Sequence, residues 1–267
     1  MKTKSKVSVK IHVFYRHCCD AKGRDEKRPE WFDYEKCFKN LLDTIDENVI
    51  INVVYDSAFN LGKLPKDNWI NNYLDKINNL FIVNVNGDGP SMNKTFEIIK
   101  EMDGITDDDI IYILENDYIH KKGWPKKVIE LFNFTDNKGY VEDINNPSKV
   151  SNENSMNTID IHNFYVGLYD HPDKYFRRYM DKKFELFVTN TQHWRETDSH
   201  CNSFLLSKKL FDNDFDIQST MYDDWEKCIW LGKNRNRKFI SPIPSLSTHG
   251  MGNLLAPTID WGSINKK

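Results

Sequence analysis

The sequence has 267 residues, of which 39% are hydrophobic and 13% are aromatic. This apolar content is enough for a folded core and excludes global disorder, and the length fits a single α/β domain. Basic residues number 37 and acidic residues 40, so the formal net charge is only −3. A balance this even gives no electrostatic reason to expect nucleic acid or an anionic membrane surface as a partner.

Two further patterns concern the cellular setting. The chain has no run of 18 apolar residues, and it begins without the apolar segment of a signal peptide, so we expect no membrane span. Its cysteines are Cys18, Cys19, Cys37, Cys201 and Cys228. Because their number is odd and no CxxC pair occurs, they fit neither a disulfide framework nor a zinc finger. We expect reduced thiols in a cytoplasmic protein.

In chain order, strand-like and helix-like segments alternate through the first half. Alternating or continuous apolar residues predict four strands, at 7–15, 49–55, 80–85 and 110–114. Apolar residues at helical spacing predict the intervening helices, at 31–45, at 69–77, from an N-cap at Ser91 to Met102, and from Gly123 onward. This β-α-β order predicts a mostly parallel sheet with helices on both faces.

The second half is less regular. Polar composition predicts a loop at 143–157 and an irregular tail at 249–267. The remaining predictions are strands at 159–168 and 239–244 and helices at 197–210 and 222–231.

Polar side chains follow each of the four predicted strands of the first half. These groups are Tyr15-Arg16, Asp56-Ser57, Asn86-Gly87-Asp88-Gly89 and Glu115-Asn116-Asp117. In open parallel sheets, ligands bind outside the carboxyl ends of the strands. We therefore expect these four groups to meet at one binding site.

The acidic triplet after the fourth strand is the strongest candidate for chemistry. Alternate residues of an extended chain point the same way, so Glu115 and Asp117 can converge on one point. Their oxygens suit Mg²⁺ or Mn²⁺. An isolated triplet of this kind is more often a simple acidic turn, but its position beside three other polar strand ends favours a metal site.

Two later features have both a purely structural and a functional interpretation. Asp223-Asp224 stands at a predicted helix start, where acidic residues usually act only as caps. As a functional group, one of the two carboxylates would deprotonate an acceptor hydroxyl. His249 lies among Ser, Thr and Gly residues in a predicted loop, where a ring nitrogen is free to bind a metal.

Together these features resemble the GT-A glycosyltransferases, in particular the inverting family 2-like transferases that use nucleotide-diphospho-sugars. The resemblance extends over residues 7–249. The residues that carry it are Val53-Val54-Tyr55-Asp56-Ser57, the turn and helix start at 86–93, Glu115-Asn116-Asp117 at the position of the DxD motif, Asp223-Asp224-Trp225-Glu226, and His249. The chain departs from the family in three places: Glu115 replaces the first Asp of DxD, Asp223 stands where Glu is common, and Ser91-Met92-Asn93-Lys94 replaces a small-residue and Arg pattern.

The resemblance implies a Rossmann-like GT-A fold in one domain. Residues 1–120 would form the nucleotide-sugar half, and residues 121–267 a smaller acceptor side with the tail. It implies metal-dependent transfer of a sugar, with inversion, from a nucleotide-diphospho-sugar (a UDP-sugar is favoured) to a hydroxyl of a glycan or other acceptor. Asp224 would be the general base, and Mn²⁺ or Mg²⁺ the cofactor. The implied donor-binding residues are Tyr15, Arg16, Asp56, Asp88, Asn93, Glu115, Asn116 and Asp117. The implied metal ligands are Asp117, His249 and Glu115, and the weaker acceptor candidates are His162, Tyr165, Trp194 and Asp223.

Two other interpretations remain. A nucleotidyltransferase can share the nucleotide-binding half of this fold. It would normally have a Gly-rich basic loop after the first strand, where this chain has only Gly23 among basic residues. The second alternative is a catalytically inactive nucleotide-sugar-binding module, against which the carboxylates of Glu115, Asp117 and Asp224 argue.

Overall fold

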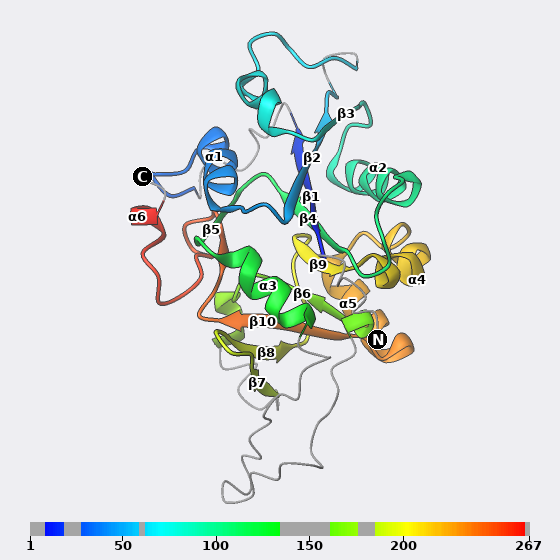
Figure 1. Ribbon diagram of the computed structural model, residues 1–267, viewed down its shortest axis with the longest axis vertical. Helices are drawn as coiled ribbons and strands as arrows, with labels where there is room; N and C mark the ends of the chain where they lie inside the picture. The colour runs from blue at the N-terminus through cyan, green and yellow to red at the C-terminus, as the bar shows by residue number, and fades with distance from the viewer. Residues whose placement is uncertain (1–8, 19–27, 59–61, 134–160, 176–184, 265–267) are drawn as a thin grey trace, which may run out of the picture.

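A computed structural model describes residues 9–18, 28–58, 62–133, 161–175 and 185–264. Within these ranges, the centre of the molecule is a nine-stranded sheet with the strand order β3-β2-β1-β4-β9-β6-β10-β8-β7 (Figure 1). Its strands are β1 (Ile11–Cys18), β2 (Val49–Asp56), β3 (Asn79–Val83), β4 (Ile110–Glu115), β6 (Phe164–Val166), β7 (Leu186–Val188), β8 (His193–Thr197), β9 (Phe204–Ser207) and β10 (Lys238–Ile243). A separate antiparallel pair joins β5 (Tyr118–His120) to β11 (Ser247–His249).

Strand direction divides the sheet into two parts. The four strands β3, β2, β1 and β4 are parallel to one another, as predicted from the first half of the sequence. Beyond β4 the sheet is mixed, because β9 and β8 run antiparallel to their neighbours, whereas β6 and β10 are parallel. The prediction of an α/β fold with a mostly parallel sheet and helices on both faces is confirmed.

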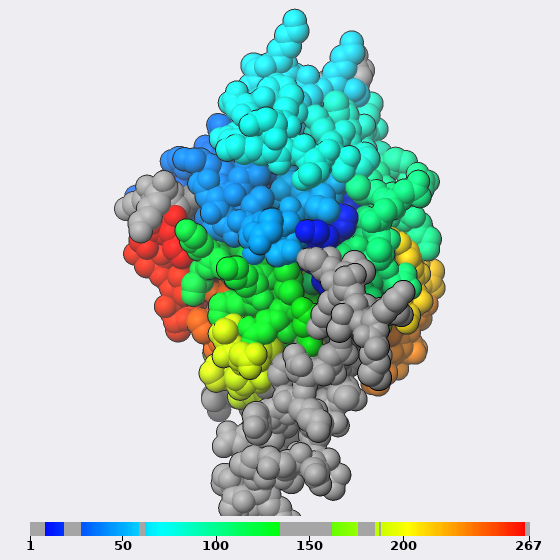
Figure 2. All heavy atoms as spheres, in the orientation of Figure 1, coloured from blue at the N-terminus to red at the C-terminus, as the bar shows by residue number. Residues whose placement is uncertain are grey.

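Helices cover both faces of the sheet and enclose two hydrophobic clusters. One cluster lies under α1 (Tyr34–Thr44), the 3-10 helix η2 (Trp69–Lys76), α3 (Trp124–Asn133) and α6 (Trp261–Ile264). The other lies under α2 (Asp88–Glu101), α4 (Lys208–Gln218) and α5 (Asp224–Arg235). In the space-filling view the cyan and blue segments lie in the upper part of the molecule, above the green and yellow segments (Figure 2). Within the described ranges, every helix is too short or too polar to span a membrane.

Alternation along the central strands decides which side chains reach which face. On β1, Val13 and Tyr15 belong to the cluster under α1, whereas Phe14 belongs to the cluster under α2. Successive side chains of a strand point to opposite faces, so Arg16 lies on the side of α2 and α5. Glu115 lies on this face too, two residues after Ile113 on β4. The pairing of β1 with β4 sets Arg16 directly opposite Glu115.

Several predicted elements differ from the structure. Residues 197–210 are not a helix: β8 ends at Thr197, β9 follows, and α4 begins only after Ser207, whose side chain accepts a hydrogen bond from Leu210 N. The apolar run of β9 is buried between β4 and β6, and a run this short has no clear period.

The other differences are smaller. Helix α2 begins at Asp88, one turn before the predicted cap at Ser91, which is buried inside the helix and donates its N–H to Gly87 O. The predicted helix at 69–77 is the 3-10 helix η2, the strand expected at 159–168 is reduced to β6 after the short 3-10 helix η4 (Ile161–Asn163), and the tail contains β11 and α6. The described cysteines, Cys18, Cys37, Cys201 and Cys228, carry free thiols. The predicted loop 143–157 and Cys19 lie outside the described residues.

Candidate functional site

Asp117 follows the carboxyl end of β4 and is 6% exposed. Its Oδ2 lies 2.8 Å from Nε2 of His249 and 2.9 Å from Nη2 of Arg28. Its Oδ1 is buried and has no hydrogen-bond partner among the described residues. A buried polar atom in a native protein normally has a partner. The carboxylate therefore offers one free acceptor oxygen beside an imidazole.

The small sheet of β5 and β11 brings His249 to this position. His249 pairs with Tyr118 across the two strands, and their rings stack with centroids 5.1 Å apart. The next residue, Gly250, donates its N–H to Asp117 O at 2.7 Å. A Cβ on Gly250 would lie 2.6 Å from the Phe32 ring and 2.8 Å from Asp117 O, so only glycine fits here without displacing a neighbour.

The two carboxyl groups of the acidic triplet are in different electrostatic states. Burial tends to raise the pKa of Asp117, but the hydrogen bond and charge of His249 and the charge of Arg28 outweigh it and hold this pKa below its usual range. Burial, followed by the negative charge of Asp117, raises the pKa of Glu115. The Glu115 side chain is engaged elsewhere, because Oε2 accepts a hydrogen bond from Ser203 at 3.1 Å. Asp117 is thus the ionised member of the pair with a free lone pair.

These contacts also bear on metal binding. In the described part of the chain, no three His, Cys, Asp or Glu side chains are grouped closely enough to hold a metal ion by themselves. The free Oδ1 of Asp117 and the imidazole of His249 fit a two-ligand site. Mg²⁺ often binds in this way, with one or two protein ligands completed by water and substrate phosphates. Glu115 is turned toward Ser203 and is not part of this pair.

Asp56, at the end of β2, is the second buried carboxylate with an unused oxygen. It is 1% exposed, and its Oδ1 accepts hydrogen bonds from Ala58 N at 3.1 Å and Val85 N at 3.2 Å. Its Oδ2 is buried and has no hydrogen-bond partner within the described ranges. Asp56 therefore both closes the turn after β2 and retains an acceptor for an N–H group.

The end of β1 is linked to Asn116. Tyr15 donates its hydroxyl to Asn116 O at 3.1 Å, and Asn116 Nδ2 lies 2.8 Å from Nδ1 of His17. Burial lowers the pKa of His17 to about 4, so its ring is neutral at pH 7 and accepts the amide hydrogen. These bonds connect the acidic triplet to strand β1.

On the other face of β1, Arg16 reaches the start of α2. Its Nη2 donates to Asp88 Oδ1 at 2.6 Å and to Asp88 O at 3.1 Å. The next residue, Gly89, lies against the Tyr222 ring, since a Cβ there would be 2.8 Å from that ring. Tyr222 also accepts a hydrogen bond from Asn93 Nδ2 at 2.9 Å. The starts of α2 and α5 are thereby held together.

Asp224 lines a cavity of about 200 Å³ beside the start of α5. Ser203 and Cys201 line the same cavity, and Ser203 connects it to Glu115. The other lining residues include hydroxyl, aromatic and charged groups: Tyr169, His171, Asp173, Lys174, Thr197, Ser199 and Trp225. Burial, and to a smaller extent the neighbouring Asp223, raises the pKa of Asp224. A carboxylate with a raised pKa beside a cavity is a candidate base.

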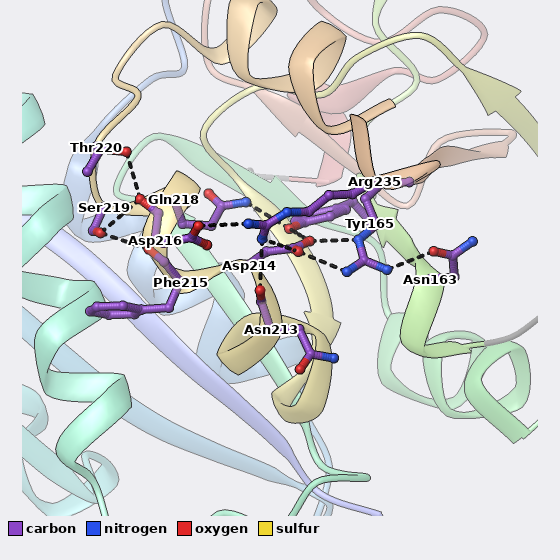
Figure 3. A network of polar contacts seen from close by, with 11 residues as sticks. Asn163, Tyr165, Asn213, Asp214, Phe215, Asp216, Gln218, Ser219, Thr220 and Arg235 are labelled. Atoms are coloured by element: carbon purple, nitrogen blue, oxygen red, sulfur yellow. Dashed lines mark hydrogen bonds and ion pairs between the residues drawn. The ribbon is translucent and has the colours of Figure 1, made fainter. Parts of the chain in front are cut away.

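The structure does not bring the four predicted acceptor residues into this cavity. Trp194 is fully buried and donates Nε1–H to Thr189, and Nδ1 of His162 lies 2.8 Å from Ser207 Oγ at the start of α4. Asp223 is the N-cap of α5. Tyr165 is also fully buried and belongs to a polar network around Asp214, which Figure 3 shows from close by.

Four residues of the site region were not predicted from the sequence. They are Arg28 on Asp117, Ser203 on Glu115, Tyr222 on Gly89, and Lys227 behind Asp224. Arg28 lies in the charged segment after β1, and Ser203 reaches Glu115 only after folding. Tyr222 and Lys227 lie close to Asp223-Asp224 in the sequence, and this position was the signal that could have identified them.

No protein-family model matches the chain, and a search of curated proteins gave no match. Among solved structures, the chain is similar to two crystal structures of the glycosyltransferase GlyE from Streptococcus pneumoniae TIGR4, one of them in the apo form. The identities are 10% and 12% and the TM-scores 0.37 and 0.39, over 86% and 87% of this chain. The matched region covers 45% of each GlyE chain.

Proposed function

We propose that the protein is a metal-dependent glycosyltransferase that moves a sugar from a nucleotide-diphospho-sugar to an acceptor hydroxyl. The observation that carries the proposal is the buried, unpartnered Oδ1 of Asp117 beside His249, at the carboxyl ends of parallel strands. Asp117 and His249 would hold Mn²⁺ or Mg²⁺. When bound, the ion would neutralise charge on the leaving diphosphate.

The donor's base would lie near the end of β2. The free Oδ2 of Asp56 is a buried acceptor, which suits the N–H of a nucleobase such as uracil. This supports a UDP-sugar as the favoured donor. Tyr15, Asn116 and Arg16 would support the donor around this position, together with Asp88, Asn93 and Glu115.

Asp224 would act as the general base. Its carboxylate would accept the proton of the acceptor hydroxyl while that oxygen attacks the anomeric carbon. The bond from this carbon to the diphosphate oxygen would break, its electron pair would leave with the diphosphate, and the anomeric configuration would invert. The hydroxyl and aromatic groups of the cavity beside Asp224 suit a sugar-like acceptor.

A panel of nucleotide-sugars tests this proposal. The purified protein is incubated with each donor and Mn²⁺, and release of the nucleotide diphosphate is measured with and without candidate acceptors. We expect slow hydrolysis of one donor class, loss of it in Asp224→Asn, and retention in Glu226→Gln, an exposed position on the same helix turn. If the protein neither binds nor turns over any donor, the proposal is wrong.

A further inference from the structure

Lys227 is a buried cation that the chemistry above does not use. It lies on α5, one turn after Asp224, and is only 1% exposed. Its ammonium is 5.8 Å from the centre of the Phe96 ring on α2, and it makes no ion pair or hydrogen bond with any group in the described ranges. Burial lowers its pKa, as expected for a desolvated ammonium. A buried charge without a partner destabilises a fold, so its presence indicates an absent anion.

Arg16, on β1, is a second buried cation with unused hydrogen-bond donors. It is 6% exposed, and its Nη2 donates to Asp88. Its Nε and Nη1 are buried and have no hydrogen-bond partner in the part of the chain that the structure describes. A hydrogen bond from a guanidinium N–H to a phosphate oxygen is charge-assisted and strong. Arg16 therefore retains donors for a second anion.

The charges of Arg16 and Lys227 act on each other. The positive charge of Arg16 is one of the charges that act on Lys227, together with those of Asp224 and Asp88. Both cations lie on the face of the sheet covered by α2 and α5, and Arg16 is opposite Glu115 in the strand register. Helix α2 begins beside them, and its N-cap, Gly87, makes no side-chain capping bond. The positive end of this helix adds to the attraction for an anion.

We propose that Arg16 and Lys227 form a binding site for the diphosphate of the donor. This inference rests on the proposed function and assigns Lys227 a role in binding rather than in proton transfer. The charge of Lys227 would attract a phosphate oxygen, and a free N–H group of Arg16 would donate a hydrogen bond to the same diphosphate. The general base, Asp224, lies one turn away on the same helix, so α5 would supply a group for the attacking oxygen and a group for the leaving diphosphate.

The test compares Lys227→Met, which removes the charge but keeps an unbranched side chain one atom shorter, with Lys227→Arg and with Lys233→Met at an exposed position on α5. Affinities for uridine, UDP, UDP-glucose, UDP-glucuronate and inorganic pyrophosphate are measured by calorimetry, and the melting temperature of the free proteins is recorded. Because a charge-assisted hydrogen bond is lost, UDP affinity should fall about tenfold or more in Lys227→Met. It should be largely kept in the other two variants.

Uridine affinity and the melting temperature should not fall in Lys227→Met, because the ammonium makes no ion pair or hydrogen bond with the described residues. Equal UDP affinity in Lys227→Met and the wild type would overturn the inference, as would a loss confined to UDP-glucuronate, which would assign the cations to a sugar carboxylate. A lower melting temperature with equal losses for uridine and UDP would mean a structural lysine. If the wild type binds no nucleotide, the proposed function fails, and pyrophosphate decides the anion site: Lys227-dependent binding supports it, and no binding overturns it.

Discussion

Nε2 of His249 lies 2.8 Å from Oδ2 of Asp117, although 132 positions separate the two residues in the sequence. The contact joins the end of β4 to β11, a strand in the C-terminal region. It leaves the second carboxylate oxygen of Asp117 buried and free. The pairing therefore forms the centre of the proposed metal and donor site.

Replacement of His249 by alanine tests the metal assignment. The variant removes one of two proposed protein ligands, so the Mn²⁺-dependent part of UDP affinity should fall by about 10–100-fold or more, since even outer-shell changes at metal sites have effects of that size. His193→Ala, at an exposed position on β8, is the matched control. Titrations of UDP with Mn²⁺ and with a chelator measure the effect. An unchanged metal dependence in His249→Ala would contradict the assignment.

Asp224→Asn tests the general base and its pH dependence. Transfer should fall by about 10²–10⁴-fold while UDP affinity stays the same. Burial raises the pKa of Asp224, and only the ionised form accepts a proton. The wild-type rate should therefore rise with pH through a pKa above the usual value of about 3.9 for aspartate.

The raised pKa of Asp224 also affects the stability of the folded protein. Burial raises the pKa of Asp224 in the folded protein above its value in the unfolded chain. At a pH above this raised pKa the carboxylate is ionised, and its burial then lowers the free energy of unfolding. Asp224→Asn should then keep or raise the melting temperature at pH 7. A large fall in melting temperature together with loss of UDP binding would identify the residue as structural.

Gly250→Ala should damage the site through crowding. The added methyl would meet the Phe32 ring and Asp117 O at well below van der Waals distance. We expect a loss of about 1–3 kcal/mol in the free energy of unfolding, with weaker Mn²⁺ binding. The control is Gly232→Ala on α5, where the nearest atom would be 3.7 Å away. There the helix should gain about 0.5–1 kcal/mol. Chemical denaturation measures the free energy of unfolding of both variants. Equal values for Gly250→Ala and Gly232→Ala would contradict the predicted steric clash at Gly250.

The Asp214 network predicts a stability effect away from the site (Figure 3). Asp214 is fully buried and accepts hydrogen bonds from Arg235, Arg237 and the Tyr165 hydroxyl. Asp214→Asn leaves two arginines without their buried anion and should cost about 3–5 kcal/mol. Asp216 is exposed and pairs with Arg235 at 2.7 Å, so Asp216→Asn should lower the free energy of unfolding by at most about 1 kcal/mol. Urea denaturation of both variants tests the ranking.

The parallel half of the sheet could be predicted because its signals are local. The strands around Val13, Val53 and Ile113 have strong apolar patterns, and each is followed by polar residues at its end. The predicted helix at 197–210 was wrong because β9 is too short to show a period, and its strand state comes from pairing with β4 and β6. Tertiary packing overrode the local pattern there.

Site residues could be predicted where they belong to a recognisable sequence motif. Asp117 and His249 were predicted together, and the structure brings them into contact. The bonds of Arg28 to Asp117 and of Ser203 to Glu115 could not be foreseen, because each joins distant segments and neither partner belongs to a local pattern. Trp194 was a plausible sugar-stacking residue by type alone, and only the fold buries it.

A crystal structure with Mn²⁺ and UDP tests the central claim most directly. Data collected at the manganese absorption edge locate the ion independently of the protein density. We predict an anomalous peak bonded to the Asp117 carboxylate and the His249 ring, with the diphosphate beside it and the base near Asp56. Manganese or nucleotide bound elsewhere on the protein, or no binding of either at saturating concentration, would contradict the account.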